Sequence, residues 1–260
     1  MRMKIAIAQM DIAYGKPGEN YLKAEKLIKE AAESNPDCIV LPELWTTGFD
    51  LDRLDEIADD QAEQSIAFLE EKAAENKVNL IGGSVANRTG SGVENTLLVV
   101  SKDGSLVHKY SKLHLFQLMD EHHYITPGTG TANFGLEGRQ FAGFVCYDIR
   151  FPEWQRKHAA NGAEAIFVVA EWPLARLAHW RALLIARAIE NQCYVIACNC
   201  VGSNPNNVFA GHSMIIDPWG EVIAEAGEGE EILTGEIDFE KVKEVRGIMP
   251  VFDDRRPEQY

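Results

Sequence analysis

The sequence predicts an α/β protein in which helices pack in layers against mixed β-sheet, organised as one domain over residues 1–260. Short apolar runs typical of buried strands alternate with longer runs whose apolar residues recur at helical spacing. An Asp-Gly pair at 103–104 indicates a tight hairpin, so antiparallel pairing is expected beside parallel crossovers. No low-complexity linker or fixed-period repeat divides the 260 residues, which favours one domain.

The strands are predicted from short apolar runs that end at turn residues. The first covers residues 4–10. Its apolar run is broken at Gln9 and Asp11 and no small-residue cleavage site follows, which favours a buried strand over a signal peptide. Residues 38–41 are wholly apolar and end at Pro42. Further strands are expected at 79–85, 94–101, 105–110, 140–146, 165–170, 193–200, 208–217, 221–225 and 231–237.

The helices are predicted from apolar residues that recur three or four positions apart. In residues 20–33 these are Leu22, Leu27, Ile28 and Ala31. The other helices are expected at 62–76, 152–161, 176–191 and 238–246. Residues 249–260 are expected to form a polar C-terminal tail.

Composition and charge exclude several classes of protein. Hydrophobic residues make up 46% and charged residues 25% of the chain, as in soluble globular proteins. A net charge of −15 argues against a nucleic-acid partner, since phosphate contacts need clustered Lys and Arg. No window reaches the roughly 18 apolar residues that a membrane helix requires. Five cysteines, an odd number mostly set in apolar runs, predict a cytoplasmic protein.

Cys146 is the first candidate for chemistry, because it ends a predicted apolar strand and opens a helix-forming segment. Backbone N–H groups at such a turn are expected to stabilise a thiolate and, later, an oxyanion on a carbonyl that the sulfur attacks. A buried structural cysteine is the alternative reading of this position.

Glu43 and Lys112 follow two other predicted strands, at positions where α/β active sites collect their functional groups. Taken singly, Glu43 is an ordinary surface carboxylate and Lys112 a lysine whose stem packs on apolar neighbours. Together with Cys146 they supply a base, a cation and a nucleophile. This combination predicts covalent catalysis.

Three segments give the chain a resemblance to the nitrilase superfamily of carbon–nitrogen hydrolases. They are residues 41–49 (LPELWTTGF), 112–116 (KLHLF) and 146–153 (CYDIRFPE). The resemblance runs from end to end, and it implies a four-layer α-β-β-α sandwich of two mixed sheets, assembled as a homodimer or larger homo-oligomer. Secondary matches lie at 171–173 (EWP), 188–191 (AIEN), 211–213 (GHS), 217–220 (DPWG) and 250–252 (PVF).

The resemblance also implies roles for site residues. Glu43 would be the general base, Lys112 the electrostatic partner and Cys146 the nucleophile. Glu121 falls where the family often carries a second glutamate, which would orient Lys112 and the substrate amide; a loop acid is the alternative. The backbone N–H of Tyr147 would share the oxyanion with Lys112. Neither a cofactor nor a metal is implied.

Within the superfamily the chain is most similar to ω-amidases, which release ammonia from the terminal amide of 2-oxo acid amides. Residues 45–49, 146–151 and 171–176 carry this similarity. The expected partner is thus a small-molecule amide. Hydrolysis of N-carbamoyl amides by the same catalytic set is one alternative, and a catalytically inactive binding protein on the same fold is another.

An acidic chain that binds an anionic 2-oxo acid must offset its own negative potential locally. Arg176, at the start of the expected helix 176–191, is the first candidate, because a guanidinium pairs bidentately with a carboxylate. The alternatives are Arg150, or a purely surface role for Arg176. Trp172 is expected either to line the substrate pocket or to fill the core.

The remaining clusters carry weaker signals. Cys193, Cys198 and Cys200 lack a histidine at zinc-finger spacing, so no structural zinc is expected. Gly82-Gly83 lacks the lysine of a phosphate-binding loop.

Overall fold

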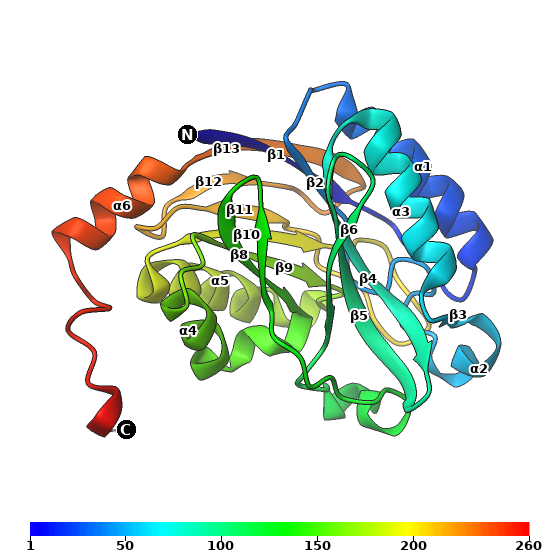
Figure 1. The fold of residues 1–260 in the computed structure, drawn as a ribbon. Helices are drawn as coiled ribbons and strands as arrows, with labels where there is room; N and C mark the ends of the chain where they lie inside the picture. The colour runs from blue at the N-terminus through cyan, green and yellow to red at the C-terminus, as the bar shows by residue number, and fades with distance from the viewer. Residues whose placement is uncertain (260) are drawn as a thin grey trace.

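The computed structural model describes residues 1–259 and contains two mixed β-sheets (Figure 1). The strands of the first sheet are β1 (Arg2–Gln9), β2 (Cys38–Val40), β3 (Asp59–Asp60), β4 (Asn79–Thr89), β5 (Gly92–Val100), β6 (Leu106–Ser111) and β13 (Glu231–Asp238). The strands of the second sheet are β7 (Asn133–Leu136), β8 (Arg139–Val145), β9 (Ala165–Ala170), β10 (Tyr194–Asn199), β11 (Met214–Ile216) and β12 (Val222–Glu225). Their orders are β13-β1-β2-β4-β5-β6, with β3 beside β4, and β12-β11-β10-β9-β8-β7.

Both sheets combine parallel and antiparallel pairs, as the sequence predicts. In the first sheet, β1 is antiparallel to β13 and parallel to β2. In the second, β8, β9 and β10 are parallel neighbours, while β7 and β11 are antiparallel to theirs. Parallel strands point their carboxyl ends to one edge of a sheet, where loops can gather functional side chains.

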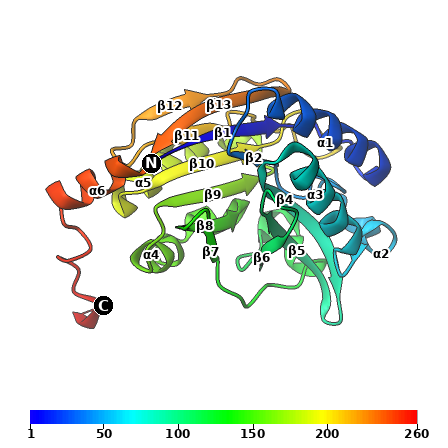
Figure 2. The same cartoon turned by 45° about the horizontal axis from the view of Figure 1, so that its top comes forward.

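The helices form the two outer layers (Figure 2). On one side, α1 (Pro17–Ala32) and α3 (Glu63–Asn76) pack on the first sheet, and on the other, α4 (Pro152–Ala160) and α5 (Leu177–Asn191) pack on the second. The structure also has α2 (Leu54–Ile57), α6 (Phe239–Ile248) and short 3₁₀ helices at Leu51–Arg53, Gln117–Met119, Glu121–His123, Cys146–Arg150, Leu174–Arg176 and Pro257–Gln259. The four-layer sandwich is confirmed.

Strand β1 illustrates how the layers are joined. Ile5 and Ile7 belong to the apolar cluster that also contains Phe167 and Val195 of the second sheet, so they face the space between the sheets. Ala6 and Ala8 belong to the cluster that contains the α1 residues Leu27 and Ile28. Alternate side chains of one strand therefore face a sheet and a helix, which explains why its sequence is apolar almost throughout.

The predicted strand at 208–217 is mostly wrong. Only Met214–Ile216 is a strand, and the residues before it form a loop. Gly211 and His212 have φ angles of 62° and 50°, which are incompatible with an extended chain. The N–H groups of Ala210 and Gly211 bond to loop carbonyls of Trp172 and Cys200 instead of to a neighbouring strand. The short strand β7 and the 3₁₀ helices were not predicted.

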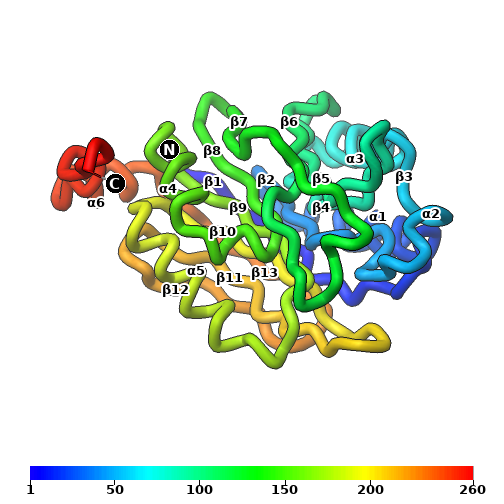
Figure 3. The backbone as a smooth tube through the Cα atoms, turned by 90° about the horizontal axis from the view of Figure 1, so that it is seen from below, coloured from blue at the N-terminus to red at the C-terminus, as the bar shows by residue number. Residues whose placement is uncertain are grey.

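The segment after α6 lies to one side of the sandwich in Figure 3. The expected polar tail 249–260 contains a turn and the 3₁₀ helix Pro257–Gln259, and its last residue, Tyr260, lies outside the described residues. The ring of Phe252 in this segment is 4.8 Å from the guanidinium carbon of Arg246. No helix within residues 1–259 is both long enough and apolar enough to cross a membrane.

Candidate active site

Four chain segments meet where strands of both sheets end. Cys146 directly follows β8, and Lys112 directly follows β6. Glu43 lies three residues after β2, and Glu121 lies in the 3₁₀ helix Glu121–His123. The structure therefore brings together all four residues that the sequence analysis placed in one site.

The loop that carries Glu43 is pressed against strand β4. A Cβ atom at Gly83 would lie 2.1 Å from the carbonyl oxygen of Pro42, and the φ of Gly83 is +63°, so only glycine fits there. The Ser84 side chain accepts a hydrogen bond from the backbone N–H of Leu44 (3.0 Å). The glycine pair 82–83, which carries no phosphate signal, thus allows the close packing that positions Glu43.

Lys112 lies between two carboxylates in the protein interior. Its Nζ is 2.9 Å from Glu43 Oε1 and 2.8 and 2.9 Å from the two carboxylate oxygens of Glu121, and all three side chains are buried. Burial alone would lower the pKa of the Lys112 ammonium, but the charges of Glu121 and Glu43 outweigh it and raise that pKa well above its ordinary value. Lys112 is therefore a fixed positive charge, not a surface lysine.

Two further groups fix Glu43. Its Oε1 accepts a hydrogen bond from the Asn95 side chain (2.8 Å), and its Oε2 accepts one from the backbone N–H of Glu171 (2.8 Å). Asn95 lies inside strand β5, where no sequence pattern marks it as a site residue. The alternative reading of Glu43 as a surface carboxylate is wrong, because the loop folds back and this carboxylate is fully buried.

Cys146 occupies a constrained turn at the mouth of this buried cluster. Its φ of 45° is left-handed, which is uncommon for a residue with a Cβ and typical of functional turns. Burial, the charge of Glu43 and a hydrogen bond to Glu43 raise the pKa of the Cys146 thiol well above its ordinary value. The resting group is therefore a thiol. The expectation that the turn itself would stabilise a thiolate was wrong, since burial and Glu43 dominate over Lys112.

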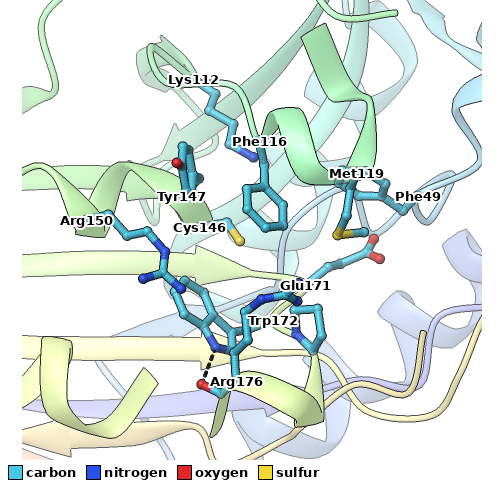
Figure 4. Close-up of a pocket in the computed structure, with 11 residues that line it drawn as sticks. Phe49, Lys112, Phe116, Met119, Cys146, Tyr147, Arg150, Glu171, Trp172 and Arg176 are labelled. Carbon is cyan, nitrogen blue, oxygen red and sulfur yellow. Dashed lines mark hydrogen bonds between the residues drawn. The ribbon is translucent and has the colours of Figure 1, made fainter. Parts of the chain in front are cut away.

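A narrow pocket opens beside the Cys146 sulfur (Figure 4). The space not filled by atoms, counted together with the open solvent at its entrance, is about 320 Å³. Its wall includes Lys112 and four aromatic residues, which are Phe49, Phe116, Tyr147 and Trp172. A wider hollow shares Phe49, Met119 and Arg176 with this pocket and leads outward.

The three predicted substrate-contacting residues line this pocket. Trp172 is 2% exposed and belongs to the core, so it both lines the pocket and fills the core. Its indole N–H donates to the carbonyl oxygen of Arg176 (2.9 Å), as Figure 4 shows. Tyr147 is the second residue of a 3₁₀ helix, where the backbone N–H has no carbonyl partner within the helix.

Two guanidinium groups flank the pocket. The Arg176 guanidinium carbon lies 5.3 Å from the centre of the Phe116 ring, and that of Arg150 lies 4.8 Å from the Trp172 ring. Within residues 1–259, neither group forms an ion pair with a carboxylate. Both are therefore available to an anionic ligand.

Glu171 is an ionisable pocket residue that the sequence analysis did not name as a site residue. It directly follows β9 and lines the pocket with 2% exposure. The strand was predicted and Glu171 was part of a matched motif, so the rule that located Glu43 at a strand end could have located Glu171 as well.

The other four cysteines lie away from the pocket lining. Within the described residues each is buried and unpaired, and the pKa of each thiol is raised by burial. No group of three or more His, Cys, Asp and Glu in residues 1–259 is arranged to hold a metal ion.

The layered fold with its buried Glu–Lys–Cys cluster defines a nitrilase-superfamily protein. A solved CN-hydrolase superfamily protein from Xanthomonas campestris superposes with a TM-score of 0.92 at 33% identity, over 98% of each chain. The protein belongs to the carbon–nitrogen hydrolase family, whose model matches residues 4–247. It is therefore an enzyme that hydrolyses carbon–nitrogen bonds.

Two relatives are similar to this chain over most or all of its length. The chain is 53% identical to the 2-oxoglutaramate amidase of Bacillus subtilis over 260 residues, which is the whole of both chains. It is 39% identical to an omega-amidase of Escherichia coli over 220 residues, 84% of each chain.

Proposed function

We propose that this protein is an ω-amidase that hydrolyses the terminal amide of small 2-oxo acid amides and releases ammonia through a thioester on Cys146. The observation that carries the proposal is the buried contact of Lys112 with both Glu43 and Glu121, placed beside the Cys146 sulfur in a small pocket. Full-length similarity to a 2-oxoglutaramate amidase supports the substrate class.

In the first half-reaction, Glu43 accepts the thiol proton while the Cys146 sulfur attacks the amide carbon. This order follows from the raised thiol pKa, because a neutral thiol needs a base at the moment of attack. The oxyanion lies between the Lys112 ammonium and the backbone N–H of Tyr147, and one such preorganised donor lowers a barrier by roughly 3–4 kcal/mol. Protonated Glu43 then gives its proton to the departing nitrogen, which leaves as ammonia, and the thioester remains.

In the second half-reaction, Glu43 takes a proton from a water molecule, whose oxygen attacks the thioester carbon. The carbon–sulfur bond breaks, the carboxylic acid product forms, and the proton on Glu43 returns to the Cys146 sulfur. Glu121 holds Lys112 in place through two hydrogen bonds, so the ammonium faces the reacting carbonyl in both steps.

The decisive experiment is a substrate panel on the purified enzyme. Ammonia release is measured from ω-amides of 2-oxo acids, from N-carbamoyl amino acids and from nitriles. We expect the 2-oxo acid amides to give the highest kcat/KM. Release of carbon dioxide together with ammonia from carbamoyl compounds, at a higher kcat/KM, would replace the proposal with carbamoyl hydrolysis. Absence of turnover on every compound would contradict the proposed substrate class.

We further propose that the enzyme works in the cytoplasm as a homodimer or larger homo-oligomer. Five unpaired cysteines within residues 1–259 fit a reducing compartment. The homo-oligomeric state is inferred only from the resemblance to the superfamily, whose members usually form homodimers or larger assemblies. Light scattering during size-exclusion chromatography tests it, since a mass near the 29.0 kDa of one chain would contradict it.

A further inference from the structure

Glu171 lines the active-site pocket, and one oxygen of its carboxyl group is buried without a partner in the described part of the chain. Its side chain is buried, and its Oε1 atom has no hydrogen-bond partner among residues 1–259. The buried carboxylates of Glu43 and Glu121 both bind the Lys112 ammonium, whereas Glu171 forms no ion pair within those residues. A buried oxygen without a partner is costly for a folded protein, so its retention in a binding pocket points to a ligand.

The surroundings of Glu171 favour an uncharged carboxylic acid. Burial and the negative charge of Glu43 raise the pKa of Glu171 well above its ordinary value, and Lys112 and the Phe49 backbone counteract this only in part. A protonated carboxyl group carries one O–H donor as well as an acceptor. Glu171 can therefore offer a hydrogen bond to an oxygen atom of a ligand.

Glu171 lines the active-site pocket on the side where Phe49 and Met119 lie (Figure 4). Figure 4 shows its carboxyl group pointing toward Met119 and Phe49 and away from the Cys146 sulfur. Phe49 and Met119 also line the outer hollow, together with Arg176. An ω-amide with its amide at Cys146 and its carboxylate at Arg176 would carry its 2-substituent, which adjoins that carboxylate, toward this side.

We propose that Glu171 is a specificity-determining residue that donates a hydrogen bond to the 2-oxo oxygen of the substrate. This inference rests on the proposed function, because it names the residue that recognises the group next to the carboxylate. A substrate with CH₂ at this position leaves the O–H without an acceptor. A 2-ammonium group has only donors, so it cannot accept this hydrogen bond either.

The test compares three five-carbon ω-amides that differ only at C2, with a carbonyl, a CH₂ or an amino group. Two variants separate donor chemistry from shape: E171Q keeps an N–H donor, and E171M has similar length without one. The readout is the kcat/KM ratio of the 2-oxo amide to the CH₂ amide, since general damage to the site cancels from a ratio. Circular dichroism and thermal unfolding confirm that both variants fold.

For the wild-type enzyme we expect a ratio above about 10, because the CH₂ amide leaves the Glu171 O–H without an acceptor. In E171M the ratio should fall by about tenfold or more, because the donor is absent. E171Q should stay within about threefold of the wild type, because it restores the donor. An unchanged ratio in E171M would overturn the role of Glu171. A preference of the wild type for the 2-amino amide would also overturn it, since an ammonium group cannot accept a hydrogen bond from Glu171.

If E171M does not fold, the ratios of the wild-type enzyme and E171Q still test the proposal about Glu171. A wild-type ratio near one, or an E171Q ratio reduced tenfold, would contradict the proposal. Turnover of none of the three amides by the wild type would sink the proposed function itself. Turnover of all three without the expected ratio would sink the inference about Glu171 alone.

Discussion

The carboxylate of Asp148 holds His114 through two hydrogen bonds to one oxygen, one from the His114 backbone N–H (3.1 Å) and one from Nδ1 (2.7 Å). Its other oxygen accepts hydrogen bonds from the Tyr110 hydroxyl (2.8 Å) and the backbone N–H of Val145 (3.1 Å). Asp148 is fully buried. It therefore ties the segment that carries Lys112 to the turn that carries Cys146.

Replacing Asp148 with Asn should loosen this connection. The amide nitrogen of Asn would face groups that donate hydrogen bonds, so at least one bond is lost and a buried donor is left unpaired. We expect kcat to fall by about tenfold or more, because small displacements of reacting groups are costly. Steady-state kinetics measure this. Tyr110→Phe is the comparison variant. It removes one donor to Asp148 and the acceptor of the Trp154 indole N–H (3.1 Å), but the carboxylate and its other three hydrogen bonds remain, so it should have the smaller effect on kcat.

Glu43→Gln should remove the general base. We expect the chemical step to slow by about a hundredfold or more. Glu43 is buried, and its Oε2 accepts a hydrogen bond from the Glu171 N–H. The NH₂ group of Gln would face one of the donors that now bond to Glu43, so we expect the free energy of unfolding to fall by about 1–3 kcal/mol. Single-turnover kinetics and urea unfolding test the two effects. A variant as fast as the wild type would transfer the role of base to Glu121.

Cys146 should be the cysteine that turnover requires. It is 8% exposed and lines the pocket, whereas the other four cysteines have no exposed surface. Iodoacetamide should therefore label Cys146 first, and activity should fall in proportion to labelling. Peptide mass spectrometry locates the label. Full activity in protein that is modified at Cys146 alone would rule out the covalent mechanism.

The sequence predicts the layers of this fold and the positions of most strands well, because apolar periodicity records burial directly, although β4 runs four residues past its predicted end at 85. It fails where loops decide the geometry. The 208–217 segment is apolar enough for a strand, but two left-handed residues turn it away from the sheet. Asn95 and Asp148 are site residues only through long-range contacts, with Glu43 and with His114, and no local pattern reveals such contacts.

The free energy of unfolding should fall in mild acid, because His158 takes up a proton more readily in the unfolded chain than in the folded protein. Burial and the charge of Lys157 lower the pKa of His158 to about 4. In the unfolded chain the ordinary value is about 6.5, so below that pH the unfolded state binds a proton that the folded state does not. The contribution of His158 is therefore complete above pH 6.5 and is lost as the pH falls toward 4.

The expected loss is about 1–3 kcal/mol between those limits, after allowance for screening. Urea unfolding at pH 7.5 and at pH 4.5 measures it. His158→Gln serves as the control, because it retains a polar group that can meet Asn133 but does not titrate in this range. Parallel pH profiles for the wild type and the variant would contradict the assignment to His158.

Arg176 should recognise the carboxylate of the substrate. Its guanidinium stacks near Phe116, it has no ion pair within residues 1–259, and it lines both the pocket and the outer hollow. Arg150 is the competing candidate, but it contacts the Trp172 ring and bonds to His179 (3.3 Å). Since the protein carries a net charge of −15, a local cation is needed to bind an anion, and Arg176 is the less engaged of the two.

Arg176→Met should therefore raise KM for carboxylate-bearing amides by about tenfold or more, because a bidentate charged contact is lost while much of the apolar stem is kept. The informative quantity is the kcat/KM ratio of carboxylate-bearing amides to neutral short amides, which should fall by the same factor. Arg150→Met, as the matched control, should change this ratio by less than about threefold, since its stacking on Trp172 leaves it a weaker ligand for a carboxylate. Equal losses on charged and neutral amides in Arg176→Met would mean that Arg176 only supports the pocket wall. A large fall of the ratio in Arg150→Met alone would then move carboxylate recognition to the other side of the pocket.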